Sequence, residues 1–301
     1  MVAVDQASPS TARPARAASV RQRSEWASVW RRLLRNRPAL VGLAIVSAVA
    51  LLAIVPELVA PYSPYAIDAA HRGNPPSPAH PFGIDQVGRD VLSRVIFGAR
   101  VAMLVGLAAT GLSLVVGVLV GATAGYLGGG VDAVLMRFVD ALQAFPILIL
   151  LIAIAAALGP SLAHVIVILG LTTWAQYARV VRADVLSLRE REFVLAARTI
   201  GVPSWRIIFR HILPNALGPI IVLASLSVAG VILLESALSF LGLGTQPPTA
   251  SWGSMLADGR TYILTYPHIA LFPGLAITAS VLAFNLLGDG LRDALDPRTR
   301  T

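Results

Sequence analysis

The segment RADVLSLREREFVLAARTIGVPSWRIIFRHILPN, Arg182 to Asn215, is a polar, arginine-rich stretch between two long apolar runs. Its first half, Val185 to Ile200, predicts a helix, because apolar residues recur near helical spacing with Arg and Glu between them. These apolar positions are Leu186, Phe193, Ala196, Ala197 and Ile200. Gly201 ends this helix, and a second short helix from Pro203 to Leu213 is expected, since Pro is accepted at the first helical position. Two short helices joined at a glycine form a protruding knuckle that another protein can grip, whereas the alternative is a basic loop lying on lipid headgroups.

Composition sets the class of the whole chain. Of 301 residues, 56% are hydrophobic and 13% are charged, which is far more apolar than a soluble domain of this size needs to be. The chain is therefore expected to be a polytopic membrane protein. In so apolar a chain, the net charge of +8 indicates basic membrane loops rather than binding of nucleic acid.

Two residue types are absent from the sequence, and each absence restricts the chemistry. All 24 basic residues are Arg, so there is no Lys with which to build a Walker A phosphate site. Any ATP must then be hydrolysed by a partner. Cys is absent as well, which excludes disulfides and thiolate chemistry in this sequence.

Six apolar segments are long enough to cross a membrane as helices. They are Ala39–Pro56, Val101–Ala124, two spans within Ala141–Ala178, Ile212–Leu234 and Thr261–Gly288. Gly159-Pro160-Ser161 predicts the turn between the third and fourth spans. The expected fold class is an all-α polytopic membrane protein with about six transmembrane helices.

The segments between the spans are assigned from their polarity and their Pro content. Residues 1–24 have no periodicity and are expected to be a disordered tail, and Trp26 to Arg37 predicts an amphipathic helix on the membrane surface. Pro61 to Arg100 predicts a proline-rich external connection without a folded domain of its own. Gln246 to Arg260 predicts an external loop in which Trp252 anchors the membrane interface.

The chain is thereby divided into a cytoplasmic tail with an amphipathic stretch, a first transmembrane helix with an external loop, a core membrane domain and a cytoplasmic C-terminal tail. The bounds are 1–37, 38–100, 101–291 and 292–301. With both ends inside, 19 Arg residues lie on the cytoplasmic side and 5 outside, in agreement with the positive-inside rule. This orientation places the segment 182–215 in the cytoplasm.

Two features of the apolar runs are candidates for function. Gly117, Gly121 and Gly125 lie along one helical face, where small residues let helix backbones approach closely. The contact is either with a partner subunit or within this chain. Glu235 ends the fifth apolar run and is either a group on a transport pathway or a structural hydrogen-bonding residue.

Neither a metal site nor a catalytic site is expected. His71 and His80 lie nine residues apart in a loop without a third nearby ligand, which is not the spacing of a recognised metal site. An intramembrane aspartyl protease is excluded, because Leu286 precedes Gly288-Asp289 where a Gly-x-Gly-Asp motif needs Gly.

Several motifs carry a family resemblance. The pattern Ala196-Ala197-x3-Gly201 followed by Leu213-Pro214 resembles the EAA loop of permease subunits in ATP-binding-cassette (ABC) importers, although Leu195 replaces the usual Glu and His211 the usual Ile. The matching segments, in chain order, are HPFGIDQVGRDVLSRVIFGARV, REREFVLAARTIGVPSWRIIFRHILPN, ESALSFLGLGTQPPTASWGSML and NLLGDGLRDALDPR. Together they resemble the second permease of the importer branch that serves dipeptides, oligopeptides, nickel and glutathione.

The resemblance implies a type I ABC importer permease fold and a set of partners. These are a homologous second permease, two ATPase subunits that bind ATP and Mg, and an external substrate-binding protein; this chain itself holds no cofactor. It also implies a bacterial plasma membrane with both termini cytoplasmic. Within a coupling region from Glu192 to Arg206, the residues expected to contact the ATPase are Glu192, Ala196, Ala197, Arg198, Gly201, Val202, Pro203, Ser204 and Trp205.

A stand-alone secondary transporter or channel is the competing hypothesis. Six spans and one near-membrane Glu would permit it, and it predicts ion-coupled transport by this chain alone. No residue identifies the substrate, which for the importer would be a di- or oligopeptide or a related small molecule.

Overall fold

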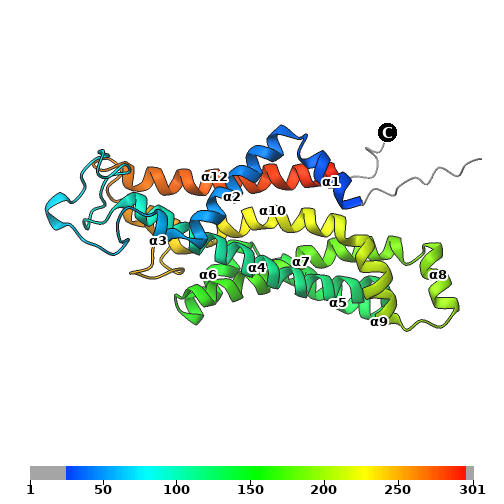
Figure 1. Ribbon diagram of the computed structural model, residues 1–301. Coiled ribbons are helices and arrows are strands. Elements are labelled where there is room, and N and C mark those ends of the chain that lie inside the picture. The colour runs from blue at the N-terminus through cyan, green and yellow to red at the C-terminus, as the bar shows by residue number, and fades with distance from the viewer. Residues whose placement is uncertain (1–24, 296–301) are drawn as a thin grey trace, which may run out of the picture.

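The computed structural model describes residues 25–295, and within them all regular structure is helical apart from one isolated bridge between Ile84 and Asp90 (Figure 1). The expected tail 1–24 and the last residues, 296–301, lie outside the described part. The elements in chain order are α1 (Glu25–Leu33), α2 (Arg37–Ile54), α3 (Pro56–Val59), η1 (Ala69–His71), α4 (Val91–Leu127), α5 (Gly129–Gln143), α6 (Ile147–Leu158), α7 (Leu162–Leu188), α8 (Glu192–Thr199), α9 (Ser204–Ile207), the π-helical η2 (Ile208–Ile212), α10 (Leu213–Phe240), α11 (Trp252–Arg260) and α12 (His268–Leu295).

Six crossings of a membrane are possible, as predicted from the apolar runs. The helices α2, α4, α7, α10 (extended at its start by α9 and η2) and α12 are each long and apolar enough to span. The remaining crossing is not the straight helix expected within Ala141–Ala178. The sixth candidate is the pair α5 and α6, if the two are counted as one broken span. The pair is bent by 85° at Ala144 to Pro146, because Pro lacks an N–H and keeps the preceding residue out of helical conformation.

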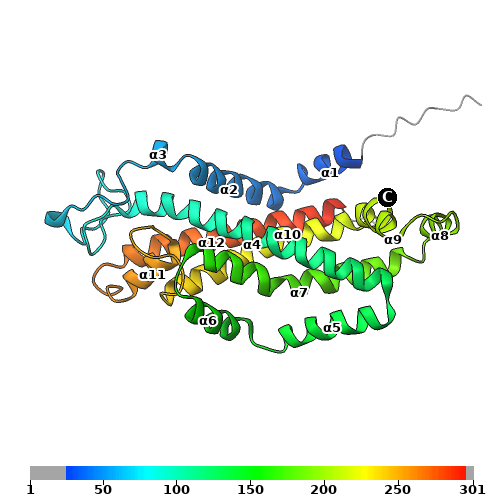
Figure 2. The same ribbon diagram turned by 90° about the horizontal axis from the view of Figure 1, so that it is seen from below.

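The glycine face of α4 packs within this chain, which decides between the two alternatives left open by the sequence. A Cβ placed on Gly117 would lie 2.6 Å from the carbonyl O of Trp174, and one on Gly125 would lie 2.9 Å from that of Arg182. Both carbonyls belong to α7. The small residues therefore let α4 and α7 lie along each other over most of their length (Figure 2).

The two ends of the bundle carry different structures. The loop between α3 and α4 lies at one end together with α11, and α1, α8, α9 and the end of α12 lie at the other (Figures 1 and 2). Leu33 of α1 is buried against Ala39 and Ala294, so α1 packs on α12. Trp30 of the same helix is exposed. The first and last described residues are thus at the same end as α8.

The loop before α4 is ordered by one carboxylate. Asp85 is buried, and its Oδ1 accepts hydrogen bonds from the backbone N–H groups of Val87, Gly88 and Arg89, each at 2.9 Å. α4 begins at Val91, ten residues before the expected span, because Asp90 caps it by accepting from Ser93 N at 2.7 Å.

The expected external loop from Gln246 to Arg260 was wrong in part. Its second half is the helix α11, which starts with a capping box between Ser251 and Ser254. Trp252 is buried and donates from Nε1 to the carbonyl of Val95 at 2.9 Å, so it joins α11 to α4 rather than anchoring a membrane interface.

Candidate coupling site

The arginine-rich segment is divided differently from the sequence prediction. The single helix expected from Val185 to Ile200 is two helices, because α7 ends at Leu188 and α8 begins at Glu192. Between them the side chain of Arg189 donates from Nη1 to the carbonyl of Gly125 at 3.0 Å. This bond ties the turn to the end of α4.

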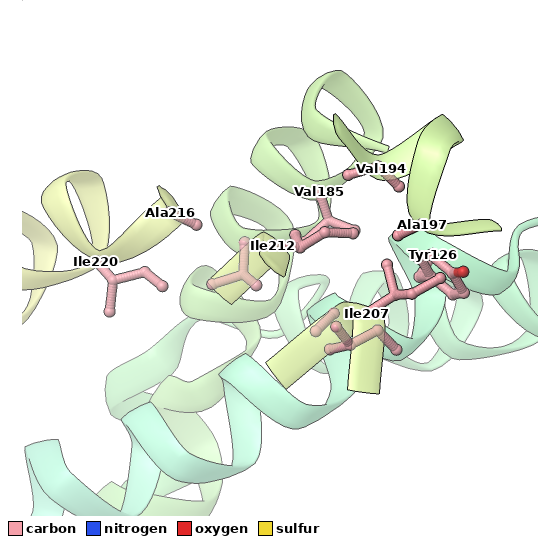
Figure 3. Packing of buried hydrophobic residues seen from close by; sticks show 11 residues of the cluster. Tyr126, Val185, Val194, Ala197, Ile207, Ile212, Ala216 and Ile220 are labelled. Atoms are coloured by element: carbon pink, nitrogen blue, oxygen red, sulfur yellow. The ribbon is translucent and has the colours of Figure 1, made fainter. Parts of the chain in front are cut away.

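α8 is held against the bundle by a small apolar contact. Val194 and Ala197 are buried in a cluster that includes Tyr126 of α4, Val185 of α7 and Ile207 of α9 (Figure 3). Burial of such side chains stabilises the contact by about 1.5 kcal/mol or more for the valine. The short helix α8 therefore has a fixed orientation relative to α4 and α7.

Arg198 adds a polar anchor to the same contact. Its guanidinium carbon lies 4.8 Å from the centre of the Tyr126 ring, and its Nε donates to the Tyr126 hydroxyl at 3.3 Å. A cation over an aromatic face is attracted by the ring's quadrupole. The expected ATPase-contact residue Arg198 is thus engaged within this chain.

Gly201 ends α8 as the sequence predicted. Its φ is +76°, and the N–H groups of Gly201 and Val202 donate to the carbonyls of Arg198 and Ala197 at 3.0 and 3.1 Å. This pair of bonds is the Schellman arrangement, in which a left-handed residue closes the helix. The bend needs a glycine because of this positive φ. Lack of space is not the reason, since no neighbouring atom lies within 4 Å of where a Cβ would be.

The second helix of the knuckle is an extension of a membrane span. Pro203 caps α9 in extended conformation, and the chain continues through η2 into α10 without a break. Movement of the knuckle would therefore be transmitted directly to α10. The predicted end of this helix at Leu213 was wrong, because the helix continues past Pro214, which follows directly on the π-helical turn η2.

An exposed apolar surface covers the tip of the knuckle. Ile200 is 80% exposed and Trp205 is 60% exposed, and the other large apolar side chains exposed there are Phe193, Leu195 and Phe209. Exposed apolar patches of this kind mark interaction surfaces. We call this set the knuckle surface.

The expected ATPase-contact residues fall into two groups. Those exposed at the tip are Glu192, Ala196, Arg198, Gly201, Pro203, Ser204 and Trp205, whereas Ala197 is buried and Val202 is half-buried against the bundle. Phe193, Leu195, Ile200 and Phe209 were not among the predicted contacts. Helical spacing contains part of the signal, because residues 193, 196 and 200 recur at i, i+3 and i+7, but it does not indicate which neighbouring residues face the bundle.

Glu235 and the two loop histidines have partners within the chain. Glu235 is buried in α10, where its Oε1 accepts from Ser239 Oγ at 2.6 Å. His80 Nδ1 lies 2.8 Å from Asp90 Oδ1. His71 forms a hydrogen bond to the exposed Asp68, which holds the pKa of that carboxyl below its usual range.

Five or six membrane crossings, with a helical knuckle that protrudes at one end, define a multi-pass membrane protein. Residues 117–301 match the family of binding-protein-dependent transport system inner membrane components, and residues 24–76 match the N-terminal transmembrane domain of oligopeptide transport permease C. The chain belongs to this family, the membrane components of ABC importers. It is thus a transport subunit and not an enzyme, since ATP hydrolysis belongs to separate ATPase subunits in this family.

Characterised relatives resemble the chain over nearly its whole length. The dipeptide transport system permease protein DppC of Alkalihalophilus pseudofirmus is 44% identical, over 92% of this chain and 91% of the relative. The oligopeptide transport system permease protein OppC of Bacillus subtilis is 40% identical over 92% and 91%. The glutathione transport system permease protein GsiD of Pectobacterium atrosepticum is 39% identical over 93% of each.

Proposed function

We propose that this chain is the second permease of an importer for dipeptides or oligopeptides, and that it forms half of the translocation pathway beside a homologous permease. The names of the relatives support a peptide or a related molecule such as glutathione as cargo. An external binding protein would deliver the cargo. It would dock at the end that carries α11 and the loop ordered by Asp85 (Figure 2).

The knuckle couples the pathway to a partner ATPase. The observation that carries this proposal is the knuckle surface, a set of exposed apolar side chains on α8, α9 and η2, together with the contact that holds α8 against the bundle. Glu192, Ala196, Pro203, Ser204 and Trp205 border or belong to this patch, and Ala197, Arg198, Gly201 and Val202 set its geometry. An ATPase groove that receives α8 would bury Ile200 at the contact.

The energy source lies outside this chain. ATP and Mg are bound by two ATPase subunits, since the sequence has no Lys for a phosphate-binding loop. Closure of the ATPases would move the knuckles together. Because α9 and η2 continue into α10, the spans would then rotate as rigid bodies to open the pathway outward.

Charge and the shared position of the first and last described residues support the membrane orientation that we propose. The end of the bundle with α8 is cytoplasmic, in a bacterial plasma membrane, and both termini are on that side. The support is the excess of Arg in segments at this end, since basic loops are retained in the cytoplasm.

Uptake of defined cargo tests the substrate. A bacterial strain without this chain should lose accumulation of a radiolabelled dipeptide, and the wild-type chain should restore it. A pentapeptide, glutathione and Ni²⁺ assayed in parallel identify the related cargo classes. If dipeptide uptake is unchanged and uptake of one of the other compounds is lost, that compound is the cargo and the dipeptide proposal is wrong.

Cross-linking tests the docking surface. The sequence has no Cys, so Ile200→Cys carries a benzophenone-maleimide probe at one position only. Irradiation of the membranes should join this chain to an ATPase subunit. Leu264→Cys is the matched control, because Leu264 is 97% exposed but lies at the opposite end, before α12. Equal cross-linking from both positions would contradict the proposed docking site.

A further inference from the structure

A cavity of about 540 Å³ lies between the bent pair α5–α6 and the helices α7 and α10. This volume is in the range of about 300–1,000 Å³ that small-molecule sites occupy. The cavity is open on one side and is bounded by spans of this chain on the other. Leu234 lines the cavity, but the buried Glu235 next to it does not.

The break between α5 and α6 opens onto this cavity. Gln143 ends α5, Ile147 begins α6, and both of these residues and Phe145 line the cavity wall. The break lies part-way along the bundle, between its two ends (Figure 2). A break at such depth leaves backbone N–H and C=O groups without helical partners, and these are tolerated against protein or a water-filled cavity but not against lipid. The open side of the cavity is therefore not covered by lipid.

Most of the wall is apolar, and none of its side chains is charged. Gln143, Gln176 and Ser227 contribute amide and hydroxyl groups, whereas the hydroxyls of Thr172 and Thr173 donate to carbonyls of their own helix. By contrast, the exposed face of α4 is wholly apolar at Leu104, Leu107, Val115 and Leu119, as lipid contact requires. The wall suits a molecule with amide or hydroxyl groups and provides no countercharge to it.

Gly230 lies beside space that no side chain of this chain fills. It lies in α10 and lines the cavity, yet no heavy atom lies within 4 Å of where its Cβ would be. Gly106 and Gly117 of α4, in contrast, would each bring a Cβ within 3.4 Å of a neighbouring helix. Gly230 is thus not needed for packing inside this chain.

We infer that this cavity is the part of the subunit against which cargo passes, with Gln143, Gln176 and Ser227 offering hydrogen bonds to amide groups and no residue offering a charge. The inference rests on the proposed import function and specifies its substrate class. A neutral wall does not discriminate between acidic and basic peptides. The side-chain charge of the cargo is therefore not selected here.

Thiol accessibility tests this assignment in the assembled transporter in proteoliposomes. Single variants Ser227→Cys and Gly230→Cys are exposed to a cationic, membrane-impermeant methanethiosulfonate, with and without ATP plus vanadate, and modification of this chain is measured by mass. Gly111→Cys is the control, because Gly111 lies on the lipid-suited face of α4 and also has no atom within 4 Å of its Cβ position. Only a hydrated thiol ionises to react, so both cavity variants should be modified at least about tenfold faster than the control in one nucleotide condition.

A bulk variant tests passage itself. Gly230→Leu should lower dipeptide uptake by about tenfold, a change of about 1.4 kcal/mol in the barrier, and Gly111→Leu should leave it within about twofold. Cavity thiols that react no faster than Gly111→Cys in either condition, or full uptake by Gly230→Leu, would overturn the inference. If the wild-type complex imports no peptide, the proposed cargo is wrong, while the thiol rates still report on the wall.

Discussion

Replacing Gly201 tests how the knuckle is built. The native φ of +76° is accessible to glycine but costs other L-residues about 1–2 kcal/mol, with a β-branched residue at the upper end. No atom lies within 4 Å of the Cβ position, so no steric clash adds to this cost. The whole effect of Gly201→Val is therefore on the backbone of the turn, and about 1–2 kcal/mol lowers the population of the native turn by about 5- to 30-fold.

Loss of this turn releases the two hydrogen bonds that close α8, and the knuckle surface is no longer presented in one orientation. Gly201→Val should therefore reduce ATP-driven uptake in proteoliposomes while the ATPase subunits continue to hydrolyse ATP. Membrane insertion should be unchanged, because the turn lies outside the spans. The measurement is the ratio of cargo imported to ATP hydrolysed.

A graded series makes the result specific to φ. Asn is tolerated in the left-handed region, so Gly201→Asn should couple nearly as well as the wild type, with Gly201→Ala between Asn and Val. If Gly201→Val imports as efficiently as Gly201→Asn, the turn does not set the coupling geometry and the reasoning is refuted.

Three further substitutions test the packing, the outer loop and the docking surface. Gly117→Leu should lower the stability of the detergent-solubilised chain by about 1–3 kcal/mol, because its Cβ meets an α7 carbonyl, whereas Gly111→Leu should not; thermal unfolding measures both. Asp85→Ala should destabilise the outer loop by about 3 kcal/mol, since three backbone N–H groups lose their acceptor, and faster proteolysis of this loop in spheroplasts reports it. Ile200→Asp should weaken ATPase co-purification by about tenfold or more, because the binding free energy from burying one Ile side chain is lost. Thermal stability should not fall, and Leu264→Asp should have neither effect.

Each of these has an outcome that would contradict it. Equal unfolding temperatures for the two glycine variants of α4 would mean that α4 and α7 can move apart at residue 117 without loss of stability. An unchanged proteolysis rate in the Asp85 variant would mean that the carboxylate does not order the loop. Full ATPase recovery with Ile200→Asp would remove Ile200 from the docking surface.

The sequence predicted the features that depend on a single local rule. Uncharged runs of sufficient length gave the membrane crossings, and Gly201 followed by Pro203 gave the bend of the knuckle. The bend was predictable because few residues other than glycine adopt a positive φ.

The features that depend on contacts between distant segments were not predictable. Pro146 lies in an apolar run that could have continued as a straight span, and only the 85° bend shows that α5 and α6 are separate helices. The Trp252 segment is a helix in which Gly253 packs against Ser236 of α10, and no local pattern indicates that contact. The apolar residues of this segment were predicted to share one face, although Ala197 is buried and Ile200 is exposed, because the segment gives no direction toward the bundle.

Co-purification tests the central claim most directly. This chain, affinity-tagged and extracted from bacterial membranes in mild detergent, should bring down a second permease and ATPase subunits with Walker motifs, and the complex should import peptide only with ATP. The contradicting result is that the purified chain alone, in liposomes, transports cargo at the full rate on an ion gradient.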